Sequence, residues 1–266
     1  ARDFLLLVML TAFLLCAISG LAHAQVDKVE VIADETGERL EVNGAHFMVR
    51  GMNWDYIPIG QNYSYSLWTQ EDHIIKAALD NEMSLLKAMG VNVIRHYVGI
   101  PPRWVEYIYR NYGIYTVINH PLGRYGVTIE GTYYSSTDYS DPQARAVLMS
   151  EMEALVDEFR DVPGMLFWLL GNENSYGLEW KSAETEALPE GERRAAMARH
   201  LYSLFGEVVE MLHRKDPGRP VAMANGDIQY LDIIAEEVQE LDIFGTNVYR
   251  GISARDLFDR VKASMG

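Results

Sequence analysis

The sequence has a single cysteine, Cys16, among its 266 residues. Because Cys16 lies in an apolar N-terminal segment, we expect no disulfide and no thiol chemistry in the rest of the chain. Basic residues are also few, since 23 Lys and Arg stand against 38 Asp and Glu, for a formal net charge of −15. This balance is unsuited to binding phosphates, so we expect no nucleic-acid partner.

Motifs for several kinds of chemistry are absent as well. No group of His, Cys and Asp has the spacing of metal ligands, and no Gly-x-Ser-x-Gly elbow occurs. No glycine-rich phosphate loop follows the first predicted strand. We therefore expect neither a metal nor a cofactor. Sixteen Tyr and five Trp residues favour sugar as a ligand, because sugar rings stack on aromatic faces.

The N-terminal segment has the pattern of a secretory signal. Residues 4–21 are apolar and nearly uncharged, and Ala22-His23-Ala24 forms a small-residue cleavage site. We predict a signal peptide at residues 1–24, and a membrane-anchoring helix is the alternative. No later segment is apolar enough to span a bilayer. The expectation is a secreted or periplasmic protein with no stable membrane span after cleavage, and its oligomeric state is left open.

Strand and helix patterns alternate along the rest of the chain. Residues 25–46 predict a short β-hairpin that leads into a barrel domain at 47–266. The predicted strands are 47–52, 91–97, 115–119, 165–170, 220–224 and 241–246. The predicted helices are 72–89, 101–113, 142–159, 192–214, 230–238 and 254–263. Such alternation implies an α/β fold with a parallel sheet and helices outside it.

Between the two common parallel architectures, the pattern favours an incomplete (β/α)8 TIM barrel. A doubly wound open sheet is the rival, but it would normally carry a glycine-rich loop after its first strand. Six strand–helix units are present, so two of eight are missing. The long segments 54–71, 121–141 and 174–191 all fall on one rim, where TIM barrels carry their active sites.

The most informative polar residues are Asn172 and Glu173, which follow the apolar strand 165–170. A carboxyl group held against Phe167 and Trp168 is disfavoured as an anion, which would make it a proton donor. A strand that ends in an ordinary polar turn is the alternative.

Other predicted strands also end in residues suited to a site. Arg95 ends the second strand and would need a carboxylate partner inside a barrel, unless it lies on the surface. His120 ends the third strand, either as a structural cap or as a substrate ligand. Asn247 and Tyr249 end the sixth and share one side of the chain. Trp54 lies in an aromatic-rich rim loop that suggests a sugar-binding cleft.

The segments "LEVNGAHFMVRGMNW", "GVNVIRHY" and "FWLLGNEN" carry a resemblance to a known group of enzymes. From residue 40 onward the chain resembles the retaining glycoside hydrolases of the large (β/α)8 clan, which contains the family 2 β-glycosidases and the family 5 enzymes. This clan places an Asn-Glu pair at the end of its fourth strand. The resemblance implies a retaining β-glycosidase acting on oligo- or polysaccharides.

The same resemblance assigns roles to individual residues. Glu173 would be the general acid/base, and Asn172 would bind the hydroxyl beside the reacting carbon. Arg95 and Tyr249 would hold a second carboxylate, the nucleophile. His120, Asn247 and Trp54 complete the expected substrate-binding set.

One part of the clan pattern is missing. The clan carries its nucleophile, a glutamate, at the end of strand seven, whereas this sequence stops at Gly266, after the sixth unit. We therefore expect a fragment whose nucleophile lies beyond residue 266 and which is inactive alone. A transglycosylase of the same clan and a non-catalytic carbohydrate-binding barrel are the alternatives.

Overall fold

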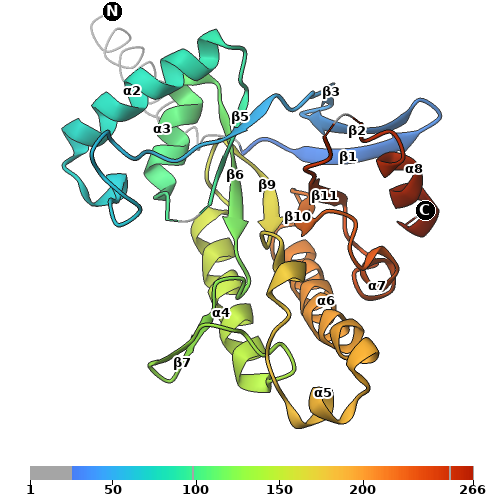
Figure 1. The fold of residues 1–266 in the computed structure, drawn as a ribbon. Helices are drawn as coiled ribbons and strands as arrows, with labels where there is room; N and C mark the ends of the chain where they lie inside the picture. Colours follow the sequence, from blue (N-terminus) through green and yellow to red (C-terminus); the bar gives the residue numbers. More distant parts are fainter. Residues whose placement is uncertain (1–25, 98, 252, 266) are drawn as a thin grey trace, which may run out of the picture.

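The computed structural model describes residues 26–97, 99–251 and 253–265. The predicted signal at 1–24 and Cys16 lie outside this part of the chain. The central feature is a curled parallel sheet in the order β11-β10-β9-β6-β5-β4, with the helices arranged around it (Figure 1). The expected incomplete TIM barrel is confirmed.

The strands and helices alternate as the sequence predicts. The sheet strands are β4 (Gly51–Asn53), β5 (Val93–His96), β6 (Tyr115–His120), β9 (Met165–Leu170), β10 (Val221–Gly226) and β11 (Ile243–Asn247). The helices are α2 (Asp72–Ala88), α3 (Pro102–Tyr112), α4 (Pro142–Phe159), α5 (Ala183–Ala187), α6 (Glu190–Lys215), α7 (Leu231–Glu237) and α8 (Leu257–Met265). All five strand pairings within the sheet are parallel.

Local signals explain where the helices begin and end. The Asp141 side chain caps α4 by accepting a hydrogen bond from the Gln143 amide, and Pro142 occupies the first turn. Helix α3 begins at Pro102 and ends at Gly113, whose φ of 66° is left-handed and suits a residue without a Cβ. These boundaries agree with the predicted ones.

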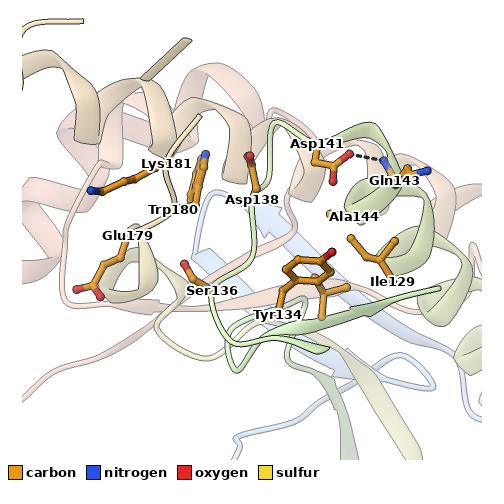
Figure 2. Close-up of a pocket in the computed structure, with 11 residues that line it drawn as sticks. Ile129, Tyr134, Ser136, Asp138, Asp141, Gln143, Ala144, Glu179, Trp180 and Lys181 are labelled. Carbon is orange, nitrogen blue, oxygen red and sulfur yellow. Dashed lines mark hydrogen bonds between the residues drawn. The ribbon is translucent and has the colours of Figure 1, made fainter. Parts of the chain in front are cut away.

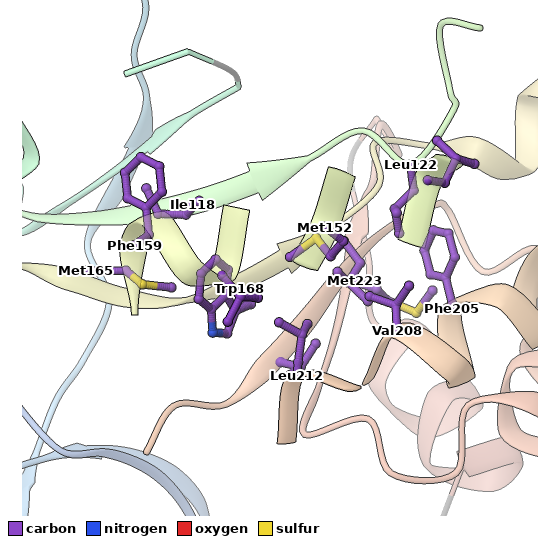
Figure 3. Close-up of a cluster of buried hydrophobic side chains, with 14 of the residues drawn as sticks. Ile118, Leu122, Met152, Phe159, Met165, Trp168, Phe205, Val208, Leu212 and Met223 are labelled. Carbon is purple, nitrogen blue, oxygen red and sulfur yellow. The ribbon is translucent and has the colours of Figure 1, made fainter. Parts of the chain in front are cut away.

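The outer face of the sheet packs on the helices and forms the larger core. Figure 3 shows Trp168 and Met165 of β9 among side chains of α4 and α6, including Met152 and Leu212. The inner face forms a second, smaller core, which includes Val93 of β5, Val117 of β6 and Ala222 of β10. Side chains alternate between these two cores because successive strand residues point to opposite faces.

The amino end of the barrel is covered by the predicted hairpin. Strands β1 (Val29–Asp34) and β2 (Gly37–Val42) pair antiparallel, and β3 (Ala45–His46) adds to β2. The Asp27 carboxylate accepts hydrogen bonds from the hydroxyls of Tyr109 and Tyr115, at 2.5 and 2.7 Å. These contacts fix the segment before β1 to the end of α3 and the start of β6.

The first predicted strand, 47–52, is wrong in its extent and burial. The structure limits β4 to Gly51–Asn53, and all three residues are exposed. Met48 and Val49 before it are 63% and 42% exposed. Strand β4 lies at the edge of the sheet and pairs with β5 alone among the described residues, so no second neighbour buries its apolar residues.

Two further features were not anticipated from the sequence. The segment 121–141 contains a small antiparallel hairpin, β7 (Val127–Ile129) and β8 (Thr132–Tyr134). Strand β9 has a β-bulge against β6, because the register shifts between Thr116 and Ile118. The extra residue lies between Met165 and Trp168, in the first half of β9.

Candidate active site

Polar side chains from several strands meet at the carboxyl end of the sheet. Arg95 of β5 donates to Asn119 Oδ1 from Nη2 and Nε, at 2.8 and 3.2 Å. The same Nη2 donates to Asn172 Oδ1 at 3.0 Å. Asn247 of β11 donates from Nδ2 to Asn172 Oδ1 at 3.3 Å and to Glu173 Oε1 at 3.0 Å. One hydrogen-bonded network thus joins strand ends that are far apart in the sequence.

The backbone around Glu173 has an uncommon conformation. Gly171 and Glu173 both have positive φ, at 70° and 58°. Left-handed backbone is unfavourable for a residue with a side chain, and such residues cluster at functional sites. The Glu173 amide donates to Ala224 O at 2.8 Å, and the Gly171 amide donates to His120 O at 2.8 Å. These bonds to β10 and β6 hold the turn in place.

The side chain of Asn174 holds the turn that contains Asn172 and Glu173. Its Oδ1 accepts from the Asn172 amide at 2.9 Å. Its Nδ2 donates to Leu122 O at 2.9 Å and to the Tyr139 hydroxyl at 3.1 Å. Asn174 is 4% exposed, and both polar groups of its side chain are hydrogen-bonded, one within the turn and one to the segment after β6. The side chain of Asn174 therefore connects the segment after β9, which carries Glu173, to the segment after β6.

Asn119 is a member of the network that the sequence interpretation missed. It is 5% exposed, and its Nδ2 donates to Leu169 O at 3.0 Å and Gly171 O at 2.9 Å. Asn119 thus connects Arg95 with the end of β9. Strand alternation gives the signal that would have found it, because Asn119 shares a face with Tyr115 and Val117, which point into the barrel.

Tyr125 is the second residue missed. Its hydroxyl accepts a hydrogen bond from Asn172 Nδ2 at 2.8 Å, although the residue is 57% exposed. It lies in the segment between β6 and β7, and no strand pattern in the sequence assigns it to the site.

Among the described residues, the guanidinium of Arg95 donates side-chain hydrogen bonds only to amide oxygens. Burial lowers the pKa of its guanidinium, while Tyr97, Tyr125 and Glu173 act in the opposite direction. Its guanidinium carbon lies 4.6 Å from the centre of the Tyr97 ring. Within the described residues, no carboxylate oxygen lies within 4.0 Å of its nitrogen atoms. The partner expected for Arg95 is thus not among these residues.

The aromatic surroundings expected for Glu173 are not formed by Trp168. That indole is completely buried on the helix side of the sheet, and its Nε1 donates to Asp216 Oδ2 at 2.9 Å. Glu173 is half-buried and its Oε1 faces the amide of Asn247. Trp168 and Glu173 therefore lie apart, and the predicted contact of the carboxyl group with Trp168 is wrong.

Three of the predicted substrate-binding residues lie outside the network. His120 Nδ1 accepts from the Leu122 amide at 3.1 Å, and its Nε2 lies 3.5 Å from Glu151 of α4, which is the capping arrangement. Trp54 is 5% exposed and packs against Trp68, with ring centres 6.3 Å apart. Its faces are covered by the loop rather than open to a ligand.

Tyr249 lies at the opposite extreme, since it is 87% exposed after β11. It is close enough to Arg95 to influence the guanidinium electrostatically. It makes no side-chain hydrogen bond within the described residues, so it is free to meet another group on this rim.

The geometry around Glu173 suits proton transfer. Among the residues that the structure describes, no group of three or more His, Cys, Asp or Glu is arranged to hold a metal ion. Glu173 offers one carboxylate, and Arg95 and Asn172 offer donors beside it. A glycosidic oxygen at Glu173 could accept a proton from its carboxyl group.

Comparisons with known proteins identify the family of this chain. The sequence model of the glycosyl hydrolases family 2, TIM barrel domain, matches residues 35–250. The β-galactosidase of Lactococcus lactis is 28% identical over 159 residues, which are 58% of this chain and 14% of that protein. The β-galactosidase of Vibrio cholerae is 27% identical over 153 residues, which are 56% of this chain and 13% of that protein. The chain thus covers about a seventh of the length of these relatives.

Solved structures show the same fold. β-Glucuronidase 3 of Bacteroides uniformis matches with a TM-score of 0.58 and 17% identity, over 89% of this chain and 25% of that one. The β-mannanase of the blue mussel Mytilus edulis matches with a TM-score of 0.58 and 12% identity, over 86% and 76% of the two chains. With most of its length matched by the family model, the chain belongs to family 2 of the glycosyl hydrolases, in its TIM barrel domain.

Proposed function

We propose that this chain forms part of a secreted, retaining β-glycosidase in which Glu173 is the general acid/base. The observation that carries the proposal is the position of Glu173, at the end of the fourth sheet strand along the chain, in left-handed backbone. Its Oε1 accepts a single hydrogen bond, from Asn247, within the part of the chain that is described. The side chain is therefore held in place but still open to a substrate.

In the proposed reaction, Glu173 acts twice. It first protonates the departing glycosidic oxygen, and it then removes a proton from the incoming water. Asn172 binds the hydroxyl beside the reacting carbon, a contact that strengthens as positive charge develops on the sugar ring. Arg95 and Asn247 hold the Asn172 amide oxygen, which fixes the direction in which its Nδ2 donates.

A second carboxylate is needed as the nucleophile. In retaining glycosidases the two carboxyl groups are about 5–5.5 Å apart. Arg95 has no carboxylate partner among the described residues, and Tyr249 beside it is exposed. We propose that a glutamate from beyond residue 266 occupies this space and that the chain alone does not turn over glycosides.

Secretion is part of the same proposal and rests on the signal pattern at residues 1–24. Within the described residues, no helix is long and apolar enough to cross a membrane. Export in fusion with a reporter enzyme, compared with a fusion that begins at Gln25, tests this step.

The acid/base role is tested in a longer gene product that extends past residue 266. We expect Glu173→Gln to slow turnover of β-glycosides with poor leaving groups by about 10²- to 10⁴-fold. Aryl glycosides with good leaving groups should lose less in the first step, because these groups depart without a proton. Glu186→Gln, on an exposed helix face, is the matched control. Unchanged turnover of the poor substrates by Glu173→Gln would refute the assignment.

A non-catalytic carbohydrate-binding barrel is the second candidate, favoured by the single carboxylate in the network. Oligosaccharide binding by the longer product, without any turnover, would support it. Transfer to a sugar rather than to water is separated by analysing the products in the presence of an acceptor disaccharide. The exposed rings of Tyr125 and Tyr176 on this rim are candidates for acceptor contacts.

A further inference from the structure

A pocket of about 470 Å³ lies on the rim outside the Glu173 network. The β7–β8 hairpin, the start of α4 and residues 179–181 enclose it (Figure 2). Its volume is within the range of small-molecule sites, about 300–1,000 Å³. None of the residues that hydrogen-bond Arg95, Asn172 or Glu173 lines it. The pocket is therefore separate from the candidate active site.

The pocket has a rigid wall. Trp180 is 4% exposed, and its ring meets the Tyr139 ring edge-on, with centres 5.5 Å apart and planes at 70°. The Tyr139 hydroxyl donates to Leu122 O at 2.8 Å. Thr137 is 2% exposed and donates to Gly123 O at 2.7 Å. Because all three side chains are buried, and those of Tyr139 and Thr137 are hydrogen-bonded, the wall is preformed rather than shaped by a ligand.

The open side of the pocket is aromatic. Tyr134 is 49% exposed, and its hydroxyl has no hydrogen-bond partner among the described residues. Ile129 and Val127 continue the apolar surface beside it. A half-exposed tyrosine with a free hydroxyl can stack on the apolar face of a sugar and hydrogen-bond its rim.

Three carboxylates line the pocket, those of Asp138, Asp141 and Glu179. In Figure 2 the carboxyl groups of Asp138 and Asp141 lie across the pocket from Tyr134. Asp138 Oδ1 accepts from Ser140, and Asp141 Oδ1 accepts from the Gln143 amide. The Oδ2 atom of each has no partner within the described residues. Two fixed acceptors therefore remain for the hydroxyl donors of a ligand.

Charge decides which ligands fit. Lys181 is the one cationic residue in the lining, and its side chain extends away from Tyr134 in Figure 2. An anionic sugar would meet Asp138 and Asp141 with no arginine to offset the repulsion. A neutral sugar offers hydroxyl donors to both carboxylates and an apolar face to Tyr134.

We propose that this pocket is a second, non-catalytic site that binds a neutral saccharide unit and excludes sugar acids. A ligand held here would lie on the same rim as Glu173, where the segments after β6 and β9 meet. The inference does not depend on the catalytic role of Glu173, because it is tested by binding rather than by turnover.

The test titrates the full chain by calorimetry with cellotriose and with trigalacturonic acid. We expect cellotriose to bind and trigalacturonic acid to show no heat of binding. Tyr134→Ala should weaken cellotriose binding about tenfold, since it removes the stacking surface. Asp141→Asn should allow trigalacturonic acid to bind, because asparagine keeps the cap on α4 and removes one charge.

Matched variants separate this pocket from other sites. Tyr133→Ala changes the neighbouring exposed tyrosine, which donates to Tyr125 O and does not line the pocket, so cellotriose affinity should be unchanged. Asn172→Ala removes a contact of the candidate active site, so the cellotriose binding that this variant retains is binding at the pocket. Loss of binding in Asn172→Ala but not in Tyr134→Ala would place the sugar in the barrel and overturn the inference. No cellotriose binding at all, with thermal unfolding intact, would overturn it too.

Discussion

Arg219 and Arg95, which lie at opposite ends of the barrel, have different kinds of partner. At the amino end, Arg219 lies 2.9 Å from Asp216, both nearly fully buried, and Trp168 donates to the same carboxylate. At the carboxyl end, Arg95 is bound by amide oxygens and Glu173 by one amide group. Arg219 thus has a carboxylate partner, whereas Arg95 and Glu173 have no ionic partner among the described residues. The carboxyl end does contain another ion pair, in which Arg250 lies 2.7 Å from Asp227.

This difference separates stability from function along one sheet. Removing one partner of a buried ion pair strongly destabilises a protein, because the other charge is left buried and uncompensated. Groups without an ionic partner contribute less to folding, but they remain available to a substrate or to another catalytic residue. The carboxyl end of a TIM barrel is where such groups are expected, and the amino end is where stabilising contacts are expected.

The largest effect is predicted at the amino end. Arg219→Met should lower the free energy of unfolding by about 3–5 kcal/mol, because it leaves the Asp216 carboxylate buried without its cation. It also removes the donors that meet Arg160 O and Met165 O. Urea unfolding monitored by circular dichroism measures the loss.

An exposed ion pair is the control for this variant. Arg103 and Asp72 lie 2.7 Å apart, with side chains 60% and 61% exposed. Arg103→Met should cost less than about 1 kcal/mol, since solvent screens this pair. Equal losses in the two variants would show that burial does not set the strength of the Arg219 pair.

The same substitution at the carboxyl end should have a smaller effect on stability. Arg95→Met removes a cation whose burial is unfavourable and whose pKa is lowered by that burial. It leaves Asn119 Oδ1 without its donor, while Asn172 Oδ1 keeps the bond from Asn247. We expect a loss of about 1–2 kcal/mol by urea unfolding. A loss as large as that of Arg219→Met would erase the contrast between the two ends.

The elements that local signals determine were predictable from the sequence. Helix α4 was predicted at 142–159 and is Pro142–Phe159, because a capping aspartate and a proline mark its start. The order of strands follows from the alternation of strand and helix patterns. The convergence of Arg95, Asn172, Glu173 and Asn247 follows in turn, since parallel strands deliver their ends to one rim.

Features that depend on neighbours were not predictable in the same way. Strand β4 has an apolar sequence, yet its burial depends on a second neighbouring strand. The bulge in β9 depends on its pairing with β6. Tyr125 reaches Asn172 through a loop whose path is set by contacts distant in sequence. The periodicity of a single segment does not indicate which other segments it contacts.

A third prediction concerns the backbone of Glu173. Glu173→Gly and Glu173→Ala both remove the carboxylate and its bond from Asn247, so they differ in their tolerance of a φ of 58°. The glycine variant should be more stable than the alanine variant by about 1 kcal/mol, because only alanine retains the left-handed penalty. Thermal and urea unfolding of the pair measure this difference.

Glu130 provides the reference for that comparison. It has a φ of 49° in the turn between β7 and β8, is exposed, and is outside the Glu173 network. The glycine and alanine variants at Glu130 should differ by a similar amount. A preference for alanine at Glu173 alone would mean that the site has another conformation in solution.

The smallest effect is expected at Asp27, which is half-exposed at the amino end. Burial raises the pKa of its carboxyl group, but the hydroxyls of Tyr109 and Tyr115 and the amide of Asn43 together outweigh burial and lower it below 3.8. A lowered pKa means that the ionised group stabilises the folded state above about pH 3.8, and that this stability is lost as the pH falls further.

In wild type, the free energy of unfolding should decrease as the pH falls below 3.8. This decrease should be smaller in Asp27→Asn, because asparagine does not take up a proton there. Urea unfolding between pH 2.5 and pH 6 measures the slope. Taking the difference between variant and wild type cancels the contributions of Asp34 and Asp80, whose pKa values are also lowered. Asp259→Asn, at an exposed position, should leave the slope unchanged. If Asp27→Asn also leaves it unchanged, the two tyrosines hold the segment before β1 without favouring the ionised carboxylate, and the amino end is completed by packing rather than by charge.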